Sequence, residues 1–250
     1  MAVHFLSPET IERRLETVPP TIPERRRELE VLFREAGCTA PHLSEQGFAH
    51  GKDANVVCVL PGKEPSEIIA GGHLDLVNEG TGAVDDWSGA SLLPSLFESL
   101  KNAPRLHTFV FIAFDGEETG LRGSRNYVAS LKPADRASVR AMVNLECLGM
   151  ALPKVWASRA DPSLLKAYWR IAAGLNLPRE GVNVDGAGDD DSHPFLDKGI
   201  PVITIHSVTP ENLRVLHSPR DNLKAIHPEE YYQSYRLAAA YLTYLDTALP

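Results

Sequence analysis

What this chain lacks narrows its function before any motif is considered. It has only three cysteines, Cys38, Cys58 and Cys147, and they are far apart in the sequence. A few widely spaced cysteines of odd number do not indicate a disulfide framework. We therefore expect a cytoplasmic protein with reduced thiols, although a secreted protein after removal of its signal would show the same pattern.

The chain also lacks an excess of basic residues and long apolar runs. Lys and Arg total 25 against 33 Asp and Glu, for a formal net charge of -8, and the basic residues form no extended stripe. This balance argues against nucleic acid and anionic membrane surfaces as partners. No apolar run is long enough to span a bilayer, and the first residues reverse the order of a secretory signal. We expect neither a membrane partner nor a signal peptide.

No linker, internal repeat or low-complexity tract divides the 250 residues, of which 43% are hydrophobic. This predicts one domain over residues 1–250, with residues 1–45 as its helical N-terminal segment. Two helices are expected within about 8–38, joined near Pro19-Pro20 and ended by Gly37.

Strand-like and helix-like segments alternate along the rest of the chain. The turn at 61–63 predicts that the first two strands pair with each other. The alternation predicts an α/β three-layer sandwich with a central mixed, mostly parallel β-sheet flanked by helices. The expected strands are 55–60, 67–70, 107–114, 141–145 and 201–205, and the expected helices are 88–100, 124–131, 162–175 and 228–247.

The apolar run 109–114 ends abruptly in Asp115, Gly116, Glu117 and Glu118. A solvated acidic turn is the simplest interpretation, but the apolar strand before it starts this turn at the edge of the core. Side chains alternate in direction along extended backbone, so two adjacent carboxylates can diverge there. One is then free to bind a metal while the other transfers protons.

Two more acidic motifs have both ordinary and functional interpretations. His73 follows two glycines that allow close backbone approach, and it is either a hydrogen-bonded surface histidine or a metal ligand oriented by Asp75. Asp85 and Asp86 precede a helix, where acids cap the N-terminus, with Ser88 as another candidate cap. A carboxylate in this glycine-flanked pair could also bridge two cations.

Glu146 and His217 complete the candidates. Glu146 ends an apolar strand, where an isolated glutamate is costly and should be paired, neutral or bound to a metal. His217 lies in a loop where Asp221 could support its ring. His206, at the end of another strand, is the main rival to His217, but no carboxylate lies near it in the sequence.

Together these motifs resemble the co-catalytic zinc aminopeptidases of peptidase family M28, from about residue 55 to the C-terminus. The resemblance implies two zinc ions per chain and the release of N-terminal residues from peptides or aminoacyl small molecules. The ordered series is Gly72-His73-x-Asp75, Gly82-x-x-Asp85-Asp86-x-Ser88-Gly89, Asp115-Gly116-Glu117-Glu118-x-Gly120, Asn144-Leu145-Glu146 and His217-x-x-x-Asp221.

The resemblance also implies a role for each residue. His73 and Glu146 would bind one zinc, Glu118 and His217 would bind the other, and Asp85 would bridge them. Glu117 would be the general base. Asp75, Asp86 and Asp221 would support the ligands from behind, and the Asp85-Asp86 peptide is a candidate cis bond. Glu146 departs from the family, which usually has aspartate at this position.

Several alternatives remain on the same scaffold. A glutaminyl-cyclase-like acyltransferase would use a single zinc, although His73 together with Asp75 favours the two-metal hydrolase. Carboxypeptidase or amidohydrolase activity is also open, and a non-catalytic module is disfavoured because no ligand is missing. Cobalt or manganese could replace zinc, and the oligomeric state is open.

Two neighbouring features receive separate predictions. The segment 189–193 lacks the spacing of a calcium-binding EF-hand, so a solvated loop or a helix start is expected. A related segment lines the substrate cleft of the resembled family, which makes His193 a possible substrate contact. Cys147 is expected to be a small core residue that points to the other face of the sheet.

Overall fold

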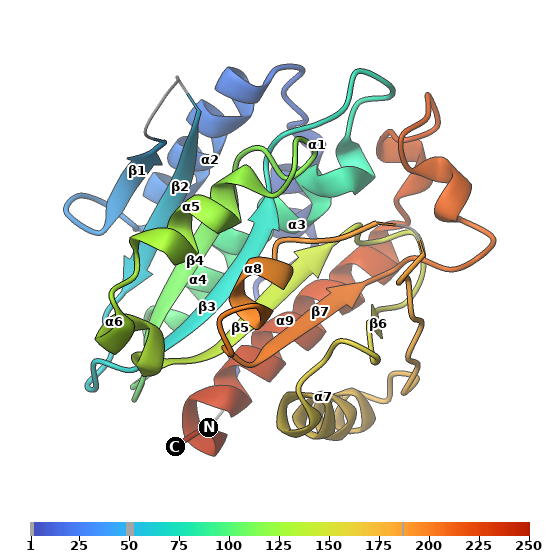
Figure 1. Ribbon diagram of the computed structural model, residues 1–250. Coiled ribbons are helices and arrows are strands. Elements are labelled where there is room, and N and C mark those ends of the chain that lie inside the picture. The colour runs from blue at the N-terminus through green and yellow to red at the C-terminus, as the bar shows by residue number, and fades with distance from the viewer. Residues whose placement is uncertain (1–2, 49–52, 187) are drawn as a thin grey trace.

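The computed structural model describes residues 3–48, 53–186 and 188–250, and a seven-stranded mixed sheet runs through them (Figure 1). Its order is β1-β2-β4-β3-β5-β7-β6. The strands β4, β3, β5 and β7 run parallel, whereas β1, β2 and β6 pair antiparallel with their neighbours. The bounds are β1 Leu43–Gly47, β2 Ala54–Leu60, β3 Glu67–His73, β4 Thr108–Phe114, β5 Val139–Glu146, β6 Lys154–Val155 and β7 Val202–His206.

Helices cover both faces of this sheet, which confirms the predicted three-layer sandwich. A large apolar cluster joins one face to the first group of helices, and a smaller cluster joins the other face to α5 and α8. The first group is α1 Pro8–Glu16, α2 Ile22–Ala36, α3 Ser88–Ala90, α4 Leu93–Leu100, α7 Pro162–Gly174 and α9 Pro228–Ala248. The second is α5 Arg122–Ser130, α6 Pro133–Ser138 and α8 His193–Leu196.

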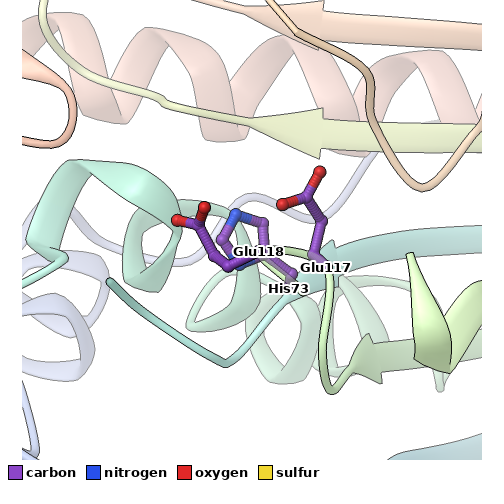
Figure 2. Close-up of side chains that lie close together, drawn as sticks. All are labelled: His73, Glu117 and Glu118. Atoms are coloured by element: carbon purple, nitrogen blue, oxygen red, sulfur yellow. The ribbon is translucent and has the colours of Figure 1, made fainter. Parts of the chain in front are cut away.

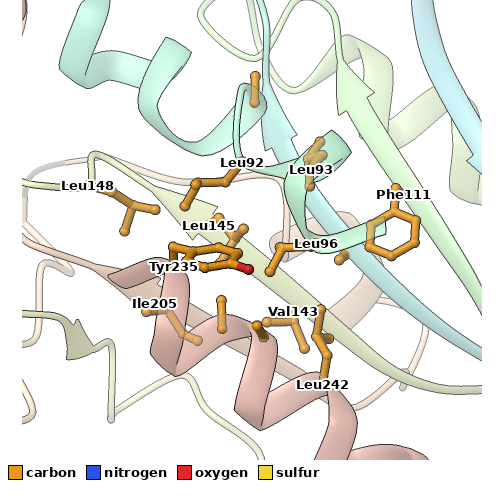
Figure 3. Packing of buried hydrophobic residues seen from close by; sticks show 14 of the residues in the cluster. Leu92, Leu93, Leu96, Phe111, Val143, Leu145, Leu148, Ile205, Tyr235 and Leu242 are labelled. Atoms are coloured by element: carbon orange, nitrogen blue, oxygen red, sulfur yellow. The ribbon is translucent and has the colours of Figure 1, made fainter. Parts of the chain in front are cut away.

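The larger cluster explains why α9 lies against the sheet. Tyr235 and Leu242 of this helix pack with Val143 and Leu145 of β5 and with Leu96 of α4 (Figure 3). These side chains are fully or almost fully buried, and burying one large apolar side chain stabilises a fold by about 1.5–3 kcal/mol. This packing fixes the central strands whose ends carry the polar residues described below.

One pairing prediction is wrong. The strands predicted at 55–60 and 67–70 are not neighbours, because β4 lies between them. A turn signal fixes the reversal of the chain but not which strand fills the space between its arms, and β4 is apolar on both faces and buried along nearly its whole length. The sequence also gave no sign of β1, a largely polar strand at the edge of the sheet that begins within the segment predicted as helical.

The cysteine prediction is wrong as well. Cys38 and Cys58 form a disulfide, and both residues are fully buried. The packing of α2 and the pairing of β1 with β2 bring the two Cα atoms to 6.4 Å, which sequence spacing alone does not indicate. Cys147 is free and buried, and it belongs to the larger apolar cluster as expected.

Within the described ranges, no helix has both the length and the apolar character needed to cross a membrane.

Candidate metal centre

The predicted metal ligands meet at the carboxyl end of the parallel strands. His73 is the last residue of β3 and Glu146 the last residue of β5, while Glu118 lies four residues after β4. Asp85 comes from the turn before α3, and His217 comes from a loop close to the C-terminal helix. Parallel strands bring their carboxyl ends to one edge of the sheet, and this is why residues far apart in the sequence converge there.

These five residues form two groups of potential metal donors that share Asp85. In the first group, His73 Nε2 lies 3.0 Å from Asp85 Oδ1 and 3.4 Å from Glu146 Oε1. In the second, His217 Nε2 lies 3.1 Å from Asp85 Oδ2 and 3.2 Å from Glu118 Oε2. Asp85 therefore presents one carboxylate oxygen to each histidine.

The spacing and chemistry of these donors fit zinc. A tetrahedral zinc site with metal–ligand distances of about 2.0–2.1 Å separates its ligand atoms by about 3.3 Å, close to the separations found in both groups. Imidazole nitrogens and carboxylate oxygens are ordinary zinc ligands. In addition, Glu118 Oε1 is buried and finds no hydrogen-bond partner among the described residues, an arrangement that a cation would relieve. Which residues bind the metal stays a prediction.

Glu117 and Glu118 have separate directions, as the sequence predicted. Figure 2 shows their carboxylates diverging on either side of the His73 ring. Both glutamates also form a third group of potential donors with His73, so Glu117 lies within reach of a metal at this position. This placement suits a group that transfers protons next to the metal.

Asp75 links the histidine to the two glutamates. One of its carboxylate oxygens accepts a hydrogen bond from the Glu117 backbone N–H at 3.0 Å, and the other accepts one from Glu118 at 3.1 Å. The first oxygen also faces His73 Nδ1 at 3.4 Å. Asp75 thus contacts predicted ligands of two motifs at once, and its support of a bound metal stays a prediction.

Asp86 supports His73 through the backbone. Its Oδ2 accepts a hydrogen bond from the His73 N–H, and its Oδ1 accepts from the backbone N–H groups of Gly89 and Cys147. The predicted helix cap by Asp86 or Ser88 is wrong, because Trp87 is the N-cap residue of α3 and no side-chain capping hydrogen bond forms there. A Cβ on Gly89 would lie 2.4 Å from the Asp86 carboxylate, which explains the need for glycine there.

Asp221 supports a different residue from the one expected. Its carboxylate accepts hydrogen bonds from the backbone N–H groups of Val84 at 2.7 Å and Asp85 at 3.3 Å, whereas the sequence suggested a contact with His217. The peptide between Asp85 and Asp86 is cis, as the resemblance implied.

Crowded carboxylates raise several pKa values in the centre. Burial, reinforced by Glu146 and Asp191, raises the pKa of Glu117 to about 10. Burial, together with Asp85, raises the pKa of Glu118 to about 7. The hydrogen bond to Asp85 raises the pKa of His217 to about 9. A cation among these carboxylates would lower the pKa values of both glutamates, so the charge pattern favours metal binding.

A cavity of about 460 Å³ opens beside the donors. It has an acidic side formed by the donor carboxylates and an apolar side, and the sequence did not indicate the residues of the apolar side because they come from separate loops. That side includes Leu121, Trp156, Val184, Val208, Leu213 and Leu216.

His206, the predicted rival of His217, lines the cavity but lies outside the donor groups. Its Nε2 donates to the Val182 carbonyl, and its Nδ1 accepts from the Val208 N–H. His193 forms ion pairs with Asp189 and Asp197 and is not among the described lining residues. Its contact with substrate stays a prediction. Cys147 also lines the cavity, and its Sγ donates to Glu146 Oε1 at 3.6 Å, so the prediction that it points to the opposite face is wrong.

The sequence of this chain is similar to those of known peptidases. The model of peptidase family M28 matches residues 55–242. The chain is 32% identical over 152 residues to leupeptin-inactivating enzyme 1 of Streptomyces exfoliatus, which covers 59% of this chain and 34% of that protein. It is 26% identical over 233 residues to aminopeptidase YwaD of Bacillus subtilis, covering 88% and 50%. The chain thus spans between a third and a half of the length of these relatives.

Solved structures share the fold. A zinc aminopeptidase from Bacillus subtilis, BSAP, superposes with a TM-score of 0.70 at 24% identity over 76% of this chain and 49% of that one. A glutaminyl cyclase from Porphyromonas gingivalis superposes with a TM-score of 0.79 at 22% identity over 97% and 99%. These likenesses establish the architecture around the centre.

Proposed function

The chain belongs to peptidase family M28, and from this membership we propose that it is an aminopeptidase that binds two zinc ions and releases N-terminal residues from peptides. The observation that carries the proposal is the position of Asp85, whose two oxygens face two different histidines. A carboxylate placed in this way suits a bridge between two metal ions.

The donor groups divide the ligands between the two ions. His73 and Glu146 would hold one zinc, Glu118 and His217 would hold the other, and Asp85 would touch both. Glu146 reaches the His73 group although aspartate is usual there, because its Oε1 lies 3.4 Å from His73 Nε2. Its other oxygen accepts a hydrogen bond from Asn144, which fixes the longer side chain.

Bound zinc would supply a water of lowered pKa and would polarise the carbonyl of the scissile bond. Glu117 takes the proton of the attacking water and returns it to the departing amine. The backbone of Glu117 is held by Asp75, so its carboxylate stays beside the donors during both transfers. Glu117 can transfer protons while Glu118 binds the metal because their carboxylates point in different directions.

The cavity also suits a free N-terminus. Its carboxylates attract an α-ammonium group, and its apolar side offers contacts to the first side chain of the substrate. This combination favours removal of the terminal residue over cleavage within a chain.

A glutaminyl-cyclase-like acyltransferase is the second candidate. The matching length of the Porphyromonas gingivalis glutaminyl cyclase favours it. The two donor groups around Asp85 weigh against it, since that alternative would use one zinc. Metal counting and an assay with an N-terminal glutamine peptide separate the two candidates.

The cellular location is a separate proposal. The sequence predicted the cytoplasm, but a buried disulfide such as Cys38–Cys58 is typical of oxidising compartments. We therefore favour an oxidising compartment. Detection of the two thiols as free in protein isolated from its natural source would contradict this.

The function is tested with a panel of aminoacyl chromogenic substrates and their N-acetylated counterparts. We expect turnover of the free substrates alone, loss of turnover with a chelator, and its return with zinc. Equal turnover of the acetylated substrates would overturn the exopeptidase assignment.

A further inference from the structure

Arg25 lies on α2, in the N-terminal segment that precedes the family match at residue 55. Its side chain is buried, with 0% of the residue exposed. A buried cation is costly unless hydrogen bonds and opposite charges satisfy it. The position of this arginine therefore needs a structural reason.

The guanidinium group of Arg25 donates hydrogen bonds to five backbone carbonyls. Four of the five carbonyls belong to the segment 74–82, which joins His73 to the turn of Asp85, and this distribution ties one short segment to one side chain. The acceptors are Pro19 for Nε at 3.2 Å, Leu74 and Asp75 for Nη1 at 3.2 Å each, and Thr81 at 2.6 Å and Gly82 at 2.8 Å for Nη2.

The contact extends beyond the segment to Trp87. The guanidinium carbon lies 5.6 Å from the centroid of the Trp87 ring, two residues beyond Asp85. Gly82 has a left-handed φ of 57°, and a Cβ there would lie 2.8 Å from Arg25 Nη2. The backbone thus approaches the guanidinium as closely as it can.

The neighbouring Arg26 forms an ion pair with Asp115, at the start of the acidic motif that contains Glu117 and Glu118. Its Nη2 lies 2.6 Å from Asp115 Oδ2, and this carboxylate also accepts a hydrogen bond from the Ala54 N–H. Asp115 directly follows β4 and precedes the turn that carries Glu117. Two consecutive arginines of α2 therefore reach the bases of two motif loops.

Arg25 keeps its charge in this position. Burial lowers its pKa to about 10, while the carboxylates of Asp221, Asp86 and Asp75 oppose the fall. The side chain thus remains a cation at neutral pH, with all of its donor groups available.

We propose that Arg25 is a positioning residue of the metal centre, which holds the segment 74–82 in the conformation that brings His73 and Asp85 together. The proposal rests on the proposed function only for the identity of the ion. It makes the N-terminal helix α2 a part of the centre, although that helix lies outside the family match.

The test compares Arg25→Lys and Arg25→Met with the control Arg27→Met, an exposed arginine on the same helix. Lysine keeps the charge but carries its three donors on one atom. It therefore cannot reach the carbonyls at both ends of the segment, 74–75 and 81–82. Zinc affinity is measured by competition with a chromogenic chelator, and backbone protection of 74–82 by hydrogen exchange, on protein whose fold is checked by circular dichroism.

We expect both Arg25 variants to bind zinc about 10–100-fold more weakly and to exchange faster in this segment. The control should match the wild type in both measurements.

Unchanged or tighter binding in the methionine variant would overturn the proposal, since it would assign Arg25 only a charge that repels the ion. Failure of both variants to fold would overturn it as well, since it would assign Arg25 to the stability of the whole domain. If the wild type binds zinc but hydrolyses no aminoacyl substrate, the proposed function fails and this inference stands.

Discussion

The donor set has two halves that share Asp85, and they are built differently. The His73 half also contains Glu146, and the His217 half also contains Glu118. The His73 half is formed by residues at the ends of central strands, and the His73 side chain is 1% exposed. The His217 half depends on a surface loop, and the His217 side chain is 57% exposed. His217 also has a left-handed φ of 51°, a conformation that only a well-determined loop maintains.

The difference indicates how strongly each half is preorganised. His73 receives support from Asp86 at its backbone and from Asp75 beside its ring, so little freedom remains to be lost when an ion binds. The ring of His217 contacts Asp85 and Glu118, and no described residue gives it comparable support from behind. Ligands held by supporting groups bind metals more tightly, so we expect the His73 half to bind its ion more tightly.

The largest effect is expected for a residue that belongs to neither half. Glu117→Gln should lower kcat by at least about 10²–10⁴-fold, because glutamine cannot accept the proton of the attacking water. Both donor groups remain intact, so zinc content should not change. Steady-state kinetics and elemental analysis check the two parts, and near-normal turnover would remove the role assigned to Glu117.

Alanine substitutions of the two histidines test the comparison itself. His217→Ala should retain one zinc per chain, whereas His73→Ala should lose affinity for both ions, because His73 contacts the shared Asp85 from the better supported side. The matching variant Glu118→Ala should behave like His217→Ala. Zinc content after dialysis decides the order, and unchanged content in both His217→Ala and Glu118→Ala would refute the site.

His206 is as buried as His73 but lies outside the donor groups, and its ring nitrogens bond the Val182 carbonyl and the Val208 N–H. Burial lowers its pKa from the ordinary 6.5 of a histidine to about 4. Because the folded pKa is depressed, its contribution to stability is complete above pH 6.5 and is lost as the pH falls toward 4. The loss amounts to about 3 kcal/mol.

The check is the free energy of unfolding of chelator-treated protein between pH 7 and 4, for the wild type and for His206→Gln. The wild type should lose more stability than the variant over this range. Parallel curves would show that His206 does not titrate as its surroundings indicate.

The smallest effect on the centre is expected from the Cys38–Cys58 disulfide, which joins residues 20 positions apart and includes none of the donors. Replacing both cysteines by serine should lower the free energy of unfolding by about 2–3 kcal/mol. Zinc affinity should stay the same. Denaturant unfolding and chelator competition measure the two quantities, and a weakened zinc site would link the disulfide to the centre.

The sequence predicted the centre better than the contacts around it. His73, Glu118 and Glu146 stood out as candidates because each lies at or just after the end of an apolar strand, and parallel strands gather such residues at one edge of the sheet. The partner of Asp221 and the role of Arg25 could not be predicted in this way. Both depend on how segments distant in the sequence pack, and a buried arginine has no local pattern that separates it from the exposed Arg27.

The same limit explains the errors in the fold. The strand order around β4 and the approach of Cys38 to Cys58 are tertiary features, fixed by which surfaces bury each other. Periodicity identifies strands and helices from their own residues, but it does not show which neighbour a strand receives.

The most direct test of the two-zinc centre is a zinc titration of the metal-free chain. Bound zinc is measured by elemental analysis after removal of the excess. A centre in which Asp85 faces two histidines should saturate at two zinc ions per chain, and Asp85→Ala should weaken the binding of both. Saturation of the wild type at one zinc ion per chain would contradict the account.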